Sequence, residues 1–403
     1  MTADGEGVVP AITIAGIALA SALVPLNSTM IAVALPDIAS DFDISKSRAS
    51  VLVTVYLAAM LVGQPLAGRL CDVLGARRLA LIAATGFGAF SAAAMFASSF
   101  GLLVTLRAAQ AAFAAALVPS VQAMLREVVP ASQRGRAFGV QGSVLGVGAG
   151  LGPVIGGLAT AAFGWRAIFG VNLPVVLVVL YVLQRRVAPS SGASVRRTSD
   201  VPEVSGRLFN RVFSAAFSTQ ALSTLAQYAL LLAVPIVLDS RGWSAASIGV
   251  ALSSLTLGMV VMGPYGGRLG DAQGRRRPVV LGLAVTLVAV AASALGGDDV
   301  PSALLVLTLL LFGLGLGVAT PSVMTAGIEA APLARVGSAA GLLSASRYVG
   351  SIVSSLVLAG VVGDDGSGLE TLLIVCAGSL AVSLVVARQL PGRVVSAAPT
   401  VMR

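Results

Sequence analysis

Residues 68–78 read Gly-Arg-Leu-Cys-Asp-Val-Leu-Gly-Ala-Arg-Arg and lie between two long apolar runs. Residues 267–277, which begin 199 positions later, read Gly-Arg-Leu-Gly-Asp-Ala-Gln-Gly-Arg-Arg-Arg. Two glycines, a leucine, an aspartate and the final arginine pair recur in register, and Pro65 has a counterpart in Pro264. Because each copy closes the second apolar run of one half of the chain, the repeat predicts a duplicated membrane bundle.

The composition also places this chain in a membrane. Of its 403 residues, 57% are hydrophobic and 11% are charged, whereas soluble domains carry about 25% charged residues. The apolar runs are about 20 residues long, which is the length of helix that crosses a bilayer. The formal net charge of +9 lies in the loops between these runs. It therefore indicates membrane topology and not nucleic acid binding.

Several classes of protein are excluded by what the sequence lacks. Histidine is absent, and the two cysteines, Cys71 and Cys376, are far apart, which excludes a disulfide framework and the usual zinc-binding spacings. We therefore expect no metal site and no cofactor. No nucleophile–base pair is evident, so the sequence does not predict an enzyme. The residues before the first apolar run include Asp4 and Glu6 but no basic residue, so this run is expected to be a retained helix and not a cleaved signal.

The apolar pattern predicts an all-α integral membrane fold with twelve spanning helices. The expected ranges are 11–35, 49–69, 78–99, 101–127, 136–162, 166–184, 210–238, 246–267, 278–296, 301–328, 336–362 and 369–388. A polar segment at 185–208, rich in Ser, Pro and Arg, is expected to be a cytoplasmic linker. It divides the chain into an N-terminal half, 1–184, and a C-terminal half, 209–403.

The basic residues fix the expected orientation. With the N-terminus inside, 20 of the 26 basic residues fall in cytoplasmic segments, 4 in outer segments and 2 within helices. Because basic loops resist translocation, both termini are predicted to be cytoplasmic. The strong preference for arginine over lysine, together with the many alanines and glycines, indicates a bacterial genome. We therefore expect a multi-pass protein of the bacterial cytoplasmic (inner) membrane.

The repeated motif is expected to form the turns between helices. Gly68 and Gly75 permit a tight turn, and Asp72 lies among Arg69, Arg77 and Arg78, which predicts a local ion pair. A plain cytoplasmic turn with positive-inside arginines is the alternative interpretation of a single copy.

Six helices, a basic linker and six further helices with a duplicated motif resemble the major facilitator superfamily. The resemblance covers nearly the whole chain and implies two pseudo-symmetric halves with a small-molecule site between them near the midplane. It also implies a protein that acts as a monomer in the lipid bilayer, and a motif whose acids contact the other half and stabilise an outward-open state. The residues that it assigns to this gate are Gly68, Arg69, Asp72, Gly75, Arg77, Arg78, Gly267, Arg268, Asp271, Gly274, Arg276 and Arg277.

A second motif predicts the direction of transport. Residues 148–157 read Gly-Ala-Gly-Leu-Gly-Pro-Val-Ile-Gly-Gly and are similar to the antiporter signature of drug-exporting facilitators. Small residues at four-residue spacing let helices approach closely in lipid, so close packing is the alternative interpretation. The residues assigned to the antiporter motif are Gly148, Gly152, Pro153, Gly156 and Gly157.

Other segments resemble the fourteen-helix drug:proton antiporters. They are residues 26–36, which read Leu-Asn-Ser-Thr-Met-Ile-Ala-Val-Ala-Leu-Pro, residues 165–169, and residues 347–350. The chain differs from that group in having twelve expected helices and in having Asn27 where the group usually has aspartate.

The polar residues within the helices define a candidate substrate or coupling site. Arg107 and Arg347 lie inside helices, where a charge is costly unless it faces a cavity or a partner, and no acid lies at mid-membrane depth. A net positive cavity favours a neutral, zwitterionic or weakly acidic molecule. Asp37 is the candidate protonatable group. The full set of candidates is Asn27, Asp37, Tyr56, Arg107, Gln110, Gln220, Gln227, Tyr228 and Arg347.

Together these patterns predict a secondary active exporter of a small drug-like or antibiotic-like organic molecule, working by alternating access and coupled to protons. The alternative is an importer or facilitator of a small organic anion, which the two arginines favour. A non-transporting membrane sensor has little support, because no soluble domain is evident.

Overall fold

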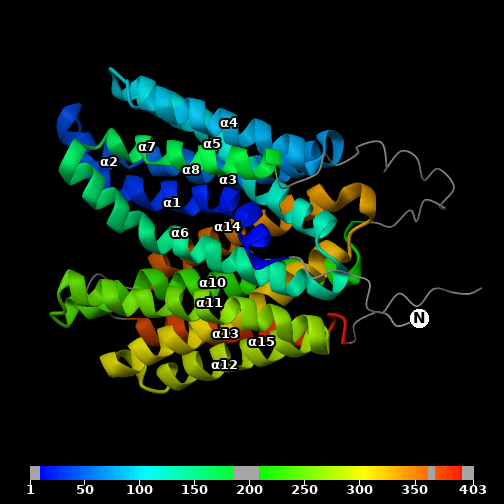
Figure 1. The fold of residues 1–403 in the computed structure, drawn as a ribbon. Helices are drawn as coiled ribbons and strands as arrows, with labels where there is room; N and C mark the ends of the chain where they lie inside the picture. Colours follow the sequence, from blue (N-terminus) through cyan, green and yellow to red (C-terminus); the bar gives the residue numbers. More distant parts are fainter. Residues whose placement is uncertain (1–9, 186–207, 362–367, 393–403) are drawn as a thin grey trace, which may run out of the picture.

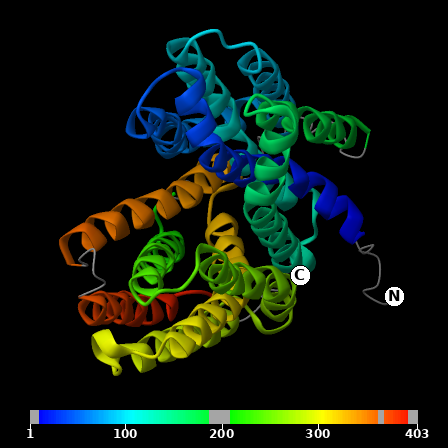
Figure 2. The same cartoon turned by 90° about the vertical axis from the view of Figure 1, so that its left-hand side faces the viewer.

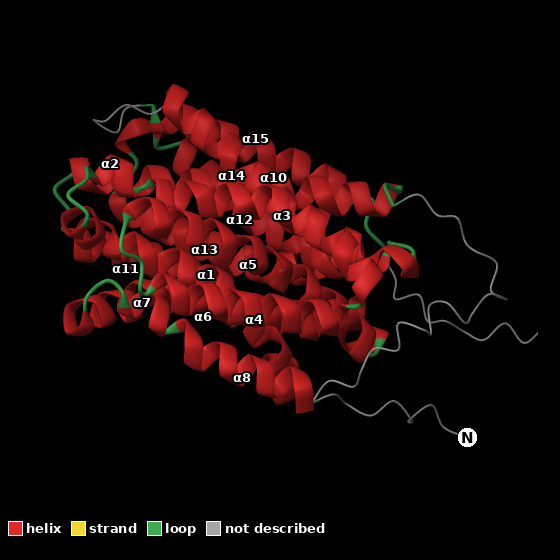
Figure 3. Ribbon diagram, turned by 90° about the horizontal axis from the view of Figure 1, so that it is seen from above, coloured by secondary structure: helices red, strands yellow, loops and turns green. Residues whose placement is uncertain are grey.

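The computed structural model describes residues 10–185, 208–361 and 368–392, and all regular elements in these ranges are helical (Figures 1 and 3). The long helices are α1 (Ala11–Asp41), α3 (Val51–Leu74), α4 (Ala76–Ala94), α5 (Phe100–Val128), α6 (Arg134–Phe163) and α8 (Asn172–Arg185), followed by α10 (Arg211–Ser240), α11 (Ala245–Gln273), α12 (Arg276–Ala294), α13 (Ser302–Glu329), α14 (Val336–Val361) and α15 (Leu369–Ala387). Short connectors are α2 (Lys46–Ala49), α7 (Ala167–Gly170), and the 3₁₀ turns η1 (Ala131–Gln133), η2 (Gly297–Asp299) and η3 (Leu333–Arg335).

The predicted all-α membrane fold is confirmed, and the long helices follow the twelve predicted ranges in order. Among the described residues, 11 helical segments are long and apolar enough to cross a membrane. The remaining long helix, α4, is not among them because Arg77 and Arg78 in its first turn lower its average hydropathy. The sixth predicted helix is divided into α7 and α8 at Val171.

Two groups of helices lie side by side when the bundle is viewed along its length (Figure 2). The first contains α1 to α8 and the second contains α10 to α15. Residues 186–207, which hold most of the predicted linker, lie outside the described residues, so the division at 185–208 stays a prediction. We call the end of the bundle that carries Gly75, Arg126 and Gly274 the basic end. The labels α2 and α7, on the left of Figure 1, mark the opposite end.

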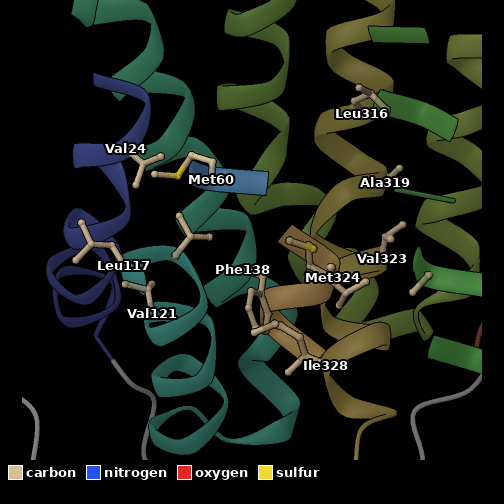
Figure 4. Packing of buried hydrophobic residues seen from close by; sticks show 14 of the residues in the cluster. Val24, Met60, Leu117, Val121, Phe138, Leu316, Ala319, Val323, Met324 and Ile328 are labelled. Atoms are coloured by element: carbon tan, nitrogen blue, oxygen red, sulfur yellow. The ribbon is translucent and has the colours of Figure 1, made fainter. Parts of the chain in front are cut away.

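The hydrophobic core is continuous across the two groups. One cluster of buried side chains includes residues from all twelve long helices. Figure 4 shows part of it, with Val24 of α1, Met60 of α3 and Phe138 of α6 in the first half, and Val323 and Met324 of α13 in the second. Packing across the boundary therefore helps to hold the halves together in this conformation.

Glycines allow the halves to touch at two equivalent crossings. At the crossing of α3 and α14, a Cβ atom added to Gly68 would collide with the backbone carbonyl of Gly337. At the crossing of α6 and α11, a Cβ atom added to Gly267 would collide with the backbone of Gly135. Small residues permit this backbone contact, and a side chain at either position would separate the halves.

The expected turn at the motif is therefore only half correct. Helix α3 continues through Gly68 and ends at Leu74, and α11 continues through Gly267 and ends at Gln273. The turns are made by Gly75, with φ 84°, and Gly274, with φ 86°, a region that favours glycine. Gly68 lies inside a helix, and its role there is close packing.

The glycines of α6 pack on α1 in the same half. An added Cβ atom would lie 2.9 Å from the Ala22 carbonyl oxygen at Gly148 and 2.9 Å from Met30 Cα at Gly156. At Gly152 it would collide with Thr29 Oγ1. The antiporter motif thus lets α1, which carries Asn27, lie directly against α6.

Replacing Gly156 with valine is expected to destabilise the protein. The new side chain would press against the backbone of Met30 in α1, and a helix backbone cannot move aside. Overpacking of this kind costs about 1–3 kcal/mol. Thermal unfolding in detergent measures the effect. The matched control is Gly142→Val in the same helix, where no atom lies within 4 Å of an added Cβ. Equal unfolding temperatures for the two variants would contradict the packing argument.

Candidate transport site and gate

A buried polar network surrounds Arg107 in the first half. The Arg107 side chain is 0% exposed, and its Nη1 donates to Asn27 Oδ1 of α1 and, at 2.7 Å, to Gln110 Oε1 of α5. Gln110 Nε2 in turn donates to Ser91 Oγ of α4 at 2.5 Å, and Asn172 Nδ2 of α8 donates to the same oxygen at 3.3 Å. Four helices therefore hold one end of the guanidinium.

An aromatic ring covers the same guanidinium. Arg107 Cζ lies 4.2 Å from the centroid of the Tyr56 ring, a distance at which the ring face attracts a cation. The Tyr56 hydroxyl donates to the Val24 carbonyl at 3.0 Å, which fixes the ring between α3 and α1. The arrangement is a cation held by one aromatic face and neutral amides.

The structure brings together only some of the predicted substrate residues. Asn27, Tyr56, Arg107 and Gln110 form one site. Asp37 is exposed on α1, ten residues beyond Asn27 and thus about 15 Å away along the helix. In the second half, Gln220 Nε2 donates to Thr224 at 3.2 Å and Gln227 Nε2 contacts Met259 Sδ at 3.4 Å. Tyr228 is 37% exposed and Arg347 is half-buried.

Sequence reasoning did not select Ser91 or Asn172 as members of this site. Both are fully buried. A lone asparagine, or a single serine in an alanine-rich run, gives no signal of its own. Their place in the network is decided by the packing of α4 and α8 around α5.

The first gate contact joins Asp72 at the end of α3 to the start of α14. Its carboxylate accepts from the Gly337 and Ser338 backbone N–H groups at 2.5 and 2.9 Å, and from the Ser338 hydroxyl. These are the second and third residues of α14, whose N–H groups have no partner within the helix. The helix dipole also favours an anion there.

This contact corrects the expected local ion pair. None of Arg69, Arg77 and Arg78 forms an ion pair with Asp72 among the described residues. Arg77 instead donates from Nε to the Leu183 carbonyl at 2.9 Å. Free N–H groups at a helix start offer the carboxylate several directed donors, whereas flexible surface arginines offer only a weak attraction.

The second gate contact repeats the first and adds charge. Asp271 of α11 accepts from the Gly135 and Arg136 N–H groups, the second and third residues of α6, at 2.7 and 2.8 Å. Arg275 Nη1 lies 2.6 Å from Asp271 Oδ1, and Arg275 Nη2 lies 3.2 Å from Glu329 Oε1. The second contact is therefore an ion-pair cluster and the first is not.

Arg275 was not selected from the sequence, although the neighbouring arginines were. Arg268, Arg276 and Arg277 are exposed. Arg275 immediately precedes α12, and the turn at Gly274 brings its side chain back onto Asp271 near the end of α11. A lone arginine in a basic run gives no sequence signal for this contact.

A further arginine closes the basic end. Arg126 at the end of α5 donates to the Ile328 carbonyl at 2.6 Å and to the Ala331 carbonyl at 3.2 Å, both in the second half. Nearer the middle, Ser344 Oγ donates to Gln122 Oε1 at 3.3 Å. The hydrogen bonds identified between the halves thus lie at the basic end and the adjoining part of the bundle, so this conformation is closed there.

A cavity of about 880 Å³ lies beside the first gate contact and not beside Arg107. Its lining includes Arg69 and Asp72 of α3, Arg335 and Ser338 near the start of α14, and Phe209 before α10. Since Arg107 is fully buried, a ligand reaches it only after the helices around it have moved.

Comparison with known proteins points to one family. A family model described as Major Facilitator Superfamily matches residues 17–355 and 216–399. The chain is 30% identical over 416 residues to the uncharacterized MFS-type transporter YvkA of Bacillus subtilis (strain 168), covering 90% of this chain and 92% of that one. It is 27% identical over 391 residues to the multidrug resistance protein Stp of Mycobacterium tuberculosis (strain CDC 1551 / Oshkosh), covering 83% and 73%.

A solved structure agrees with the fold. The MFS proton:xylose symporter XylE, bound to 6-bromo-6-deoxy-D-glucose, superimposes with a TM-score of 0.75 and 15% sequence identity, over 93% of this chain and 94% of that one. At this identity the likeness concerns the arrangement of the helices alone.

Proposed function

Because the chain belongs to the Major Facilitator Superfamily, whose members are transporters and not enzymes, we propose that it exports a small organic molecule of drug or antibiotic type by alternating access, coupled to protons. The observation that carries the proposal is the glycine ridge of α6, which resembles the antiporter motif and packs directly on α1. The name of the Mycobacterium relative, a multidrug resistance protein, supports the same direction. Arg107 and Arg347, on which the importer or facilitator alternative rests, bear on the charge of the substrate and not on the direction of transport.

The described conformation fits one state of such a cycle. The halves are latched at the basic end by Asp72, Asp271 and Arg126. We propose that the basic end faces the bacterial cytoplasm, with both termini on that side, so that this state is closed toward the cytoplasm. The path between the halves lies within one chain, which supports a functional monomer.

Accumulation of a panel of antibiotics and dyes in a pump-deficient bacterial host tests export. Cells that express the protein are expected to accumulate less of at least one compound, and a protonophore is expected to restore accumulation. Equal accumulation of every compound with and without the protein would reject export. An effect that survives the protonophore would reject proton coupling while leaving export in place.

Asp37 remains the proposed protonatable group, because the Arg107 network contains no carboxylate. Asp37→Asn is expected to lower pH-dependent export about a hundredfold, the effect of removing a general acid–base group at the low end of its range. The control is Asp43→Asn, another exposed acid at the same end, whose positive φ of 49° asparagine tolerates. If Asp37→Asn keeps the pH dependence of the parent protein, the proton is carried elsewhere.

A further inference from the structure

The guanidinium of Arg107 has one edge without a partner. Nη1 is occupied by Asn27 and Gln110, whereas Nε and Nη2 are buried and have no hydrogen-bond partner among the described residues. In a planar guanidinium, Nε and Nη2 lie on the same side and donate two parallel N–H bonds. That fork matches the two oxygens of a carboxylate.

The charge of Arg107 is also unbalanced. Its hydrogen-bond acceptors are neutral amides, and no carboxylate of the described residues forms an ion pair with it. An unpaired charge buried in this way is strongly unfavourable, and each unsatisfied buried donor adds to that cost. A cation–π contact with Tyr56 compensates only part of it. The site is therefore complete only when an anion is present.

The open edge is held in a fixed place. Asn27, Gln110, Ser91 and Asn172 fix the Nη1 end through one continuous network, and the Tyr56 ring covers the guanidinium. Donors held in advance lose little freedom when a ligand binds. Tyr56 lies twelve residues before Gly68 on α3, about 18 Å from the latched crossing, and toward the end away from the identified hydrogen bonds between the halves.

From these observations we infer that Arg107 docks an anionic oxygen group of the transported molecule through Nε and Nη2, so that the substrates are organic anions or zwitterions with an aromatic or apolar body that packs on Tyr56. The inference deepens the proposed export function, and it rests on that function when it calls the anion a substrate. The docking of the anion itself depends only on the site.

Binding of three isosteric probes to the purified full-length protein tests the inference. The probes are 2-naphthoate, 2-naphthamide and 2-naphthamidine, which share one ring system and carry a negative, neutral or positive group at neutral pH. Calorimetry in a low-salt buffer is expected to show that naphthoate binds at least about tenfold more tightly than naphthamide. This is the gain in affinity that one desolvated charge pair gives. Naphthamidine is expected to bind weakest.

Two variants remove the unbalanced charge in different ways. Arg107→Gln removes the guanidinium, and Asn27→Asp places a carboxylate at the Nη1 end that neutralises Arg107 while Nε and Nη2 stay free. Both are expected to abolish the preference for naphthoate over naphthamide while naphthamide binding persists. The control Arg48→Gln removes one positive charge from the same half outside the network and is expected to keep the preference. Because Asn27→Asp is nearly isosteric, it serves if Arg107→Gln fails to fold.

The remaining outcomes overturn the inference. Equal binding of naphthoate and naphthamide to the parent protein, or a preference that survives in both variants, would show that Arg107 does not dock an organic anion. If chloride alone stabilises the parent protein against heat, but not the variants, and naphthoate does not bind, the site is one for an inorganic anion and the substrate class is wrong.

Failure of the export proposal gives a different pattern. In that case no compound of any charge depends on the protein in the cell accumulation assay, yet the purified protein still distinguishes naphthoate from naphthamide. If instead neutral compounds are exported and naphthoate shows no preferential binding, export stands and the anion inference alone falls.

Discussion

Replacing Gly267 with leucine is expected to abolish transport while leaving the protein folded. A Cβ atom at this position would collide with the backbone of Gly135 and Arg136 in the other half, and backbone atoms of a helix cannot turn aside. The variant can relieve the collision only by holding α6 and α11 apart at the basic end. A transporter that works by alternating access must close at each end of the bundle in turn. A variant that cannot close at the basic end therefore cannot complete the cycle.

This effect is measured as a transport rate in inside-out vesicles. The compound used is one that the accumulation assay has identified. We expect a fall of about a hundredfold, which corresponds to the loss of roughly 3 kcal/mol of closure free energy. Gly249→Leu is the matched control, because it lies in the same helix and no atom lies within 4 Å of an added Cβ. Size-exclusion chromatography in detergent checks that both variants fold. Normal transport by Gly267→Leu would show that the α6–α11 crossing does not have to close.

Asp271→Asn is expected to open the basic end more than Asp72→Asn does. The side chains of Asp271 and Arg275 are only 9% and 8% exposed, and removing one member of such a pair costs about 3 kcal/mol or more. Asp72 accepts hydrogen bonds from neutral donors, so its charge contributes about 1.5 kcal/mol. The ratio of closed to open protein should therefore fall roughly a hundredfold in the first variant and roughly tenfold in the second.

A native cysteine reports on this opening. Cys71 is 4% exposed at the α3–α14 crossing, and its Cβ would lie 2.6 Å from a Cβ added to Gly337. Its alkylation by N-ethylmaleimide, followed by peptide mass spectrometry, should accelerate in both variants and more in Asp271→Asn. Cys376, buried within the second half, serves as the internal control. Asp239→Asn at the opposite end should change nothing. Equal labelling rates in the two gate variants would show that the ion-pair cluster adds no strength to the closure.

The asymmetry between the two gate contacts has a consequence for how the protein works. Both acids bind the second and third residues of a helix in the other half, so they repeat the same contact. Only the second contact recruits Arg275 and Glu329, since the position equivalent to Arg275 in the first copy is Ala76. The two sides of the closure therefore differ in strength, and the weaker side at Asp72 is expected to open first.

Most of the architecture is predictable because it depends on local properties of the chain. The length of the apolar runs fixes the number of long helices, and the repeat of residues 68–78 at 267–277 fixes the two halves. The turns at Gly75 and Gly274 follow from the need for positive φ. The motif and the glycines of 148–157 are sufficient for the resemblance to the superfamily, which the family comparison confirms.

The expectations that failed concern neighbours distant in sequence. Gly68 was expected in a turn, but α3 continues through it, and its missing side chain makes room for the backbone of Gly337 in the other half. Asp72 was expected to pair with nearby arginines, but it binds the start of α14, more than 260 positions away. Nothing in the local sequence says which helix start lies within reach of a carboxylate.

By itself, then, the sequence determined a duplicated, all-helical membrane transporter, because hydrophobic length and repeated motifs are properties of short segments. The tertiary structure alone decided what each polar group meets. It placed Asn27 and Gln110 on one end of the Arg107 guanidinium and left the Nε and Nη2 edge open. The physical reason is that the rotation of each helix about its axis is set by packing against its neighbours, and that rotation determines which side chains face one another.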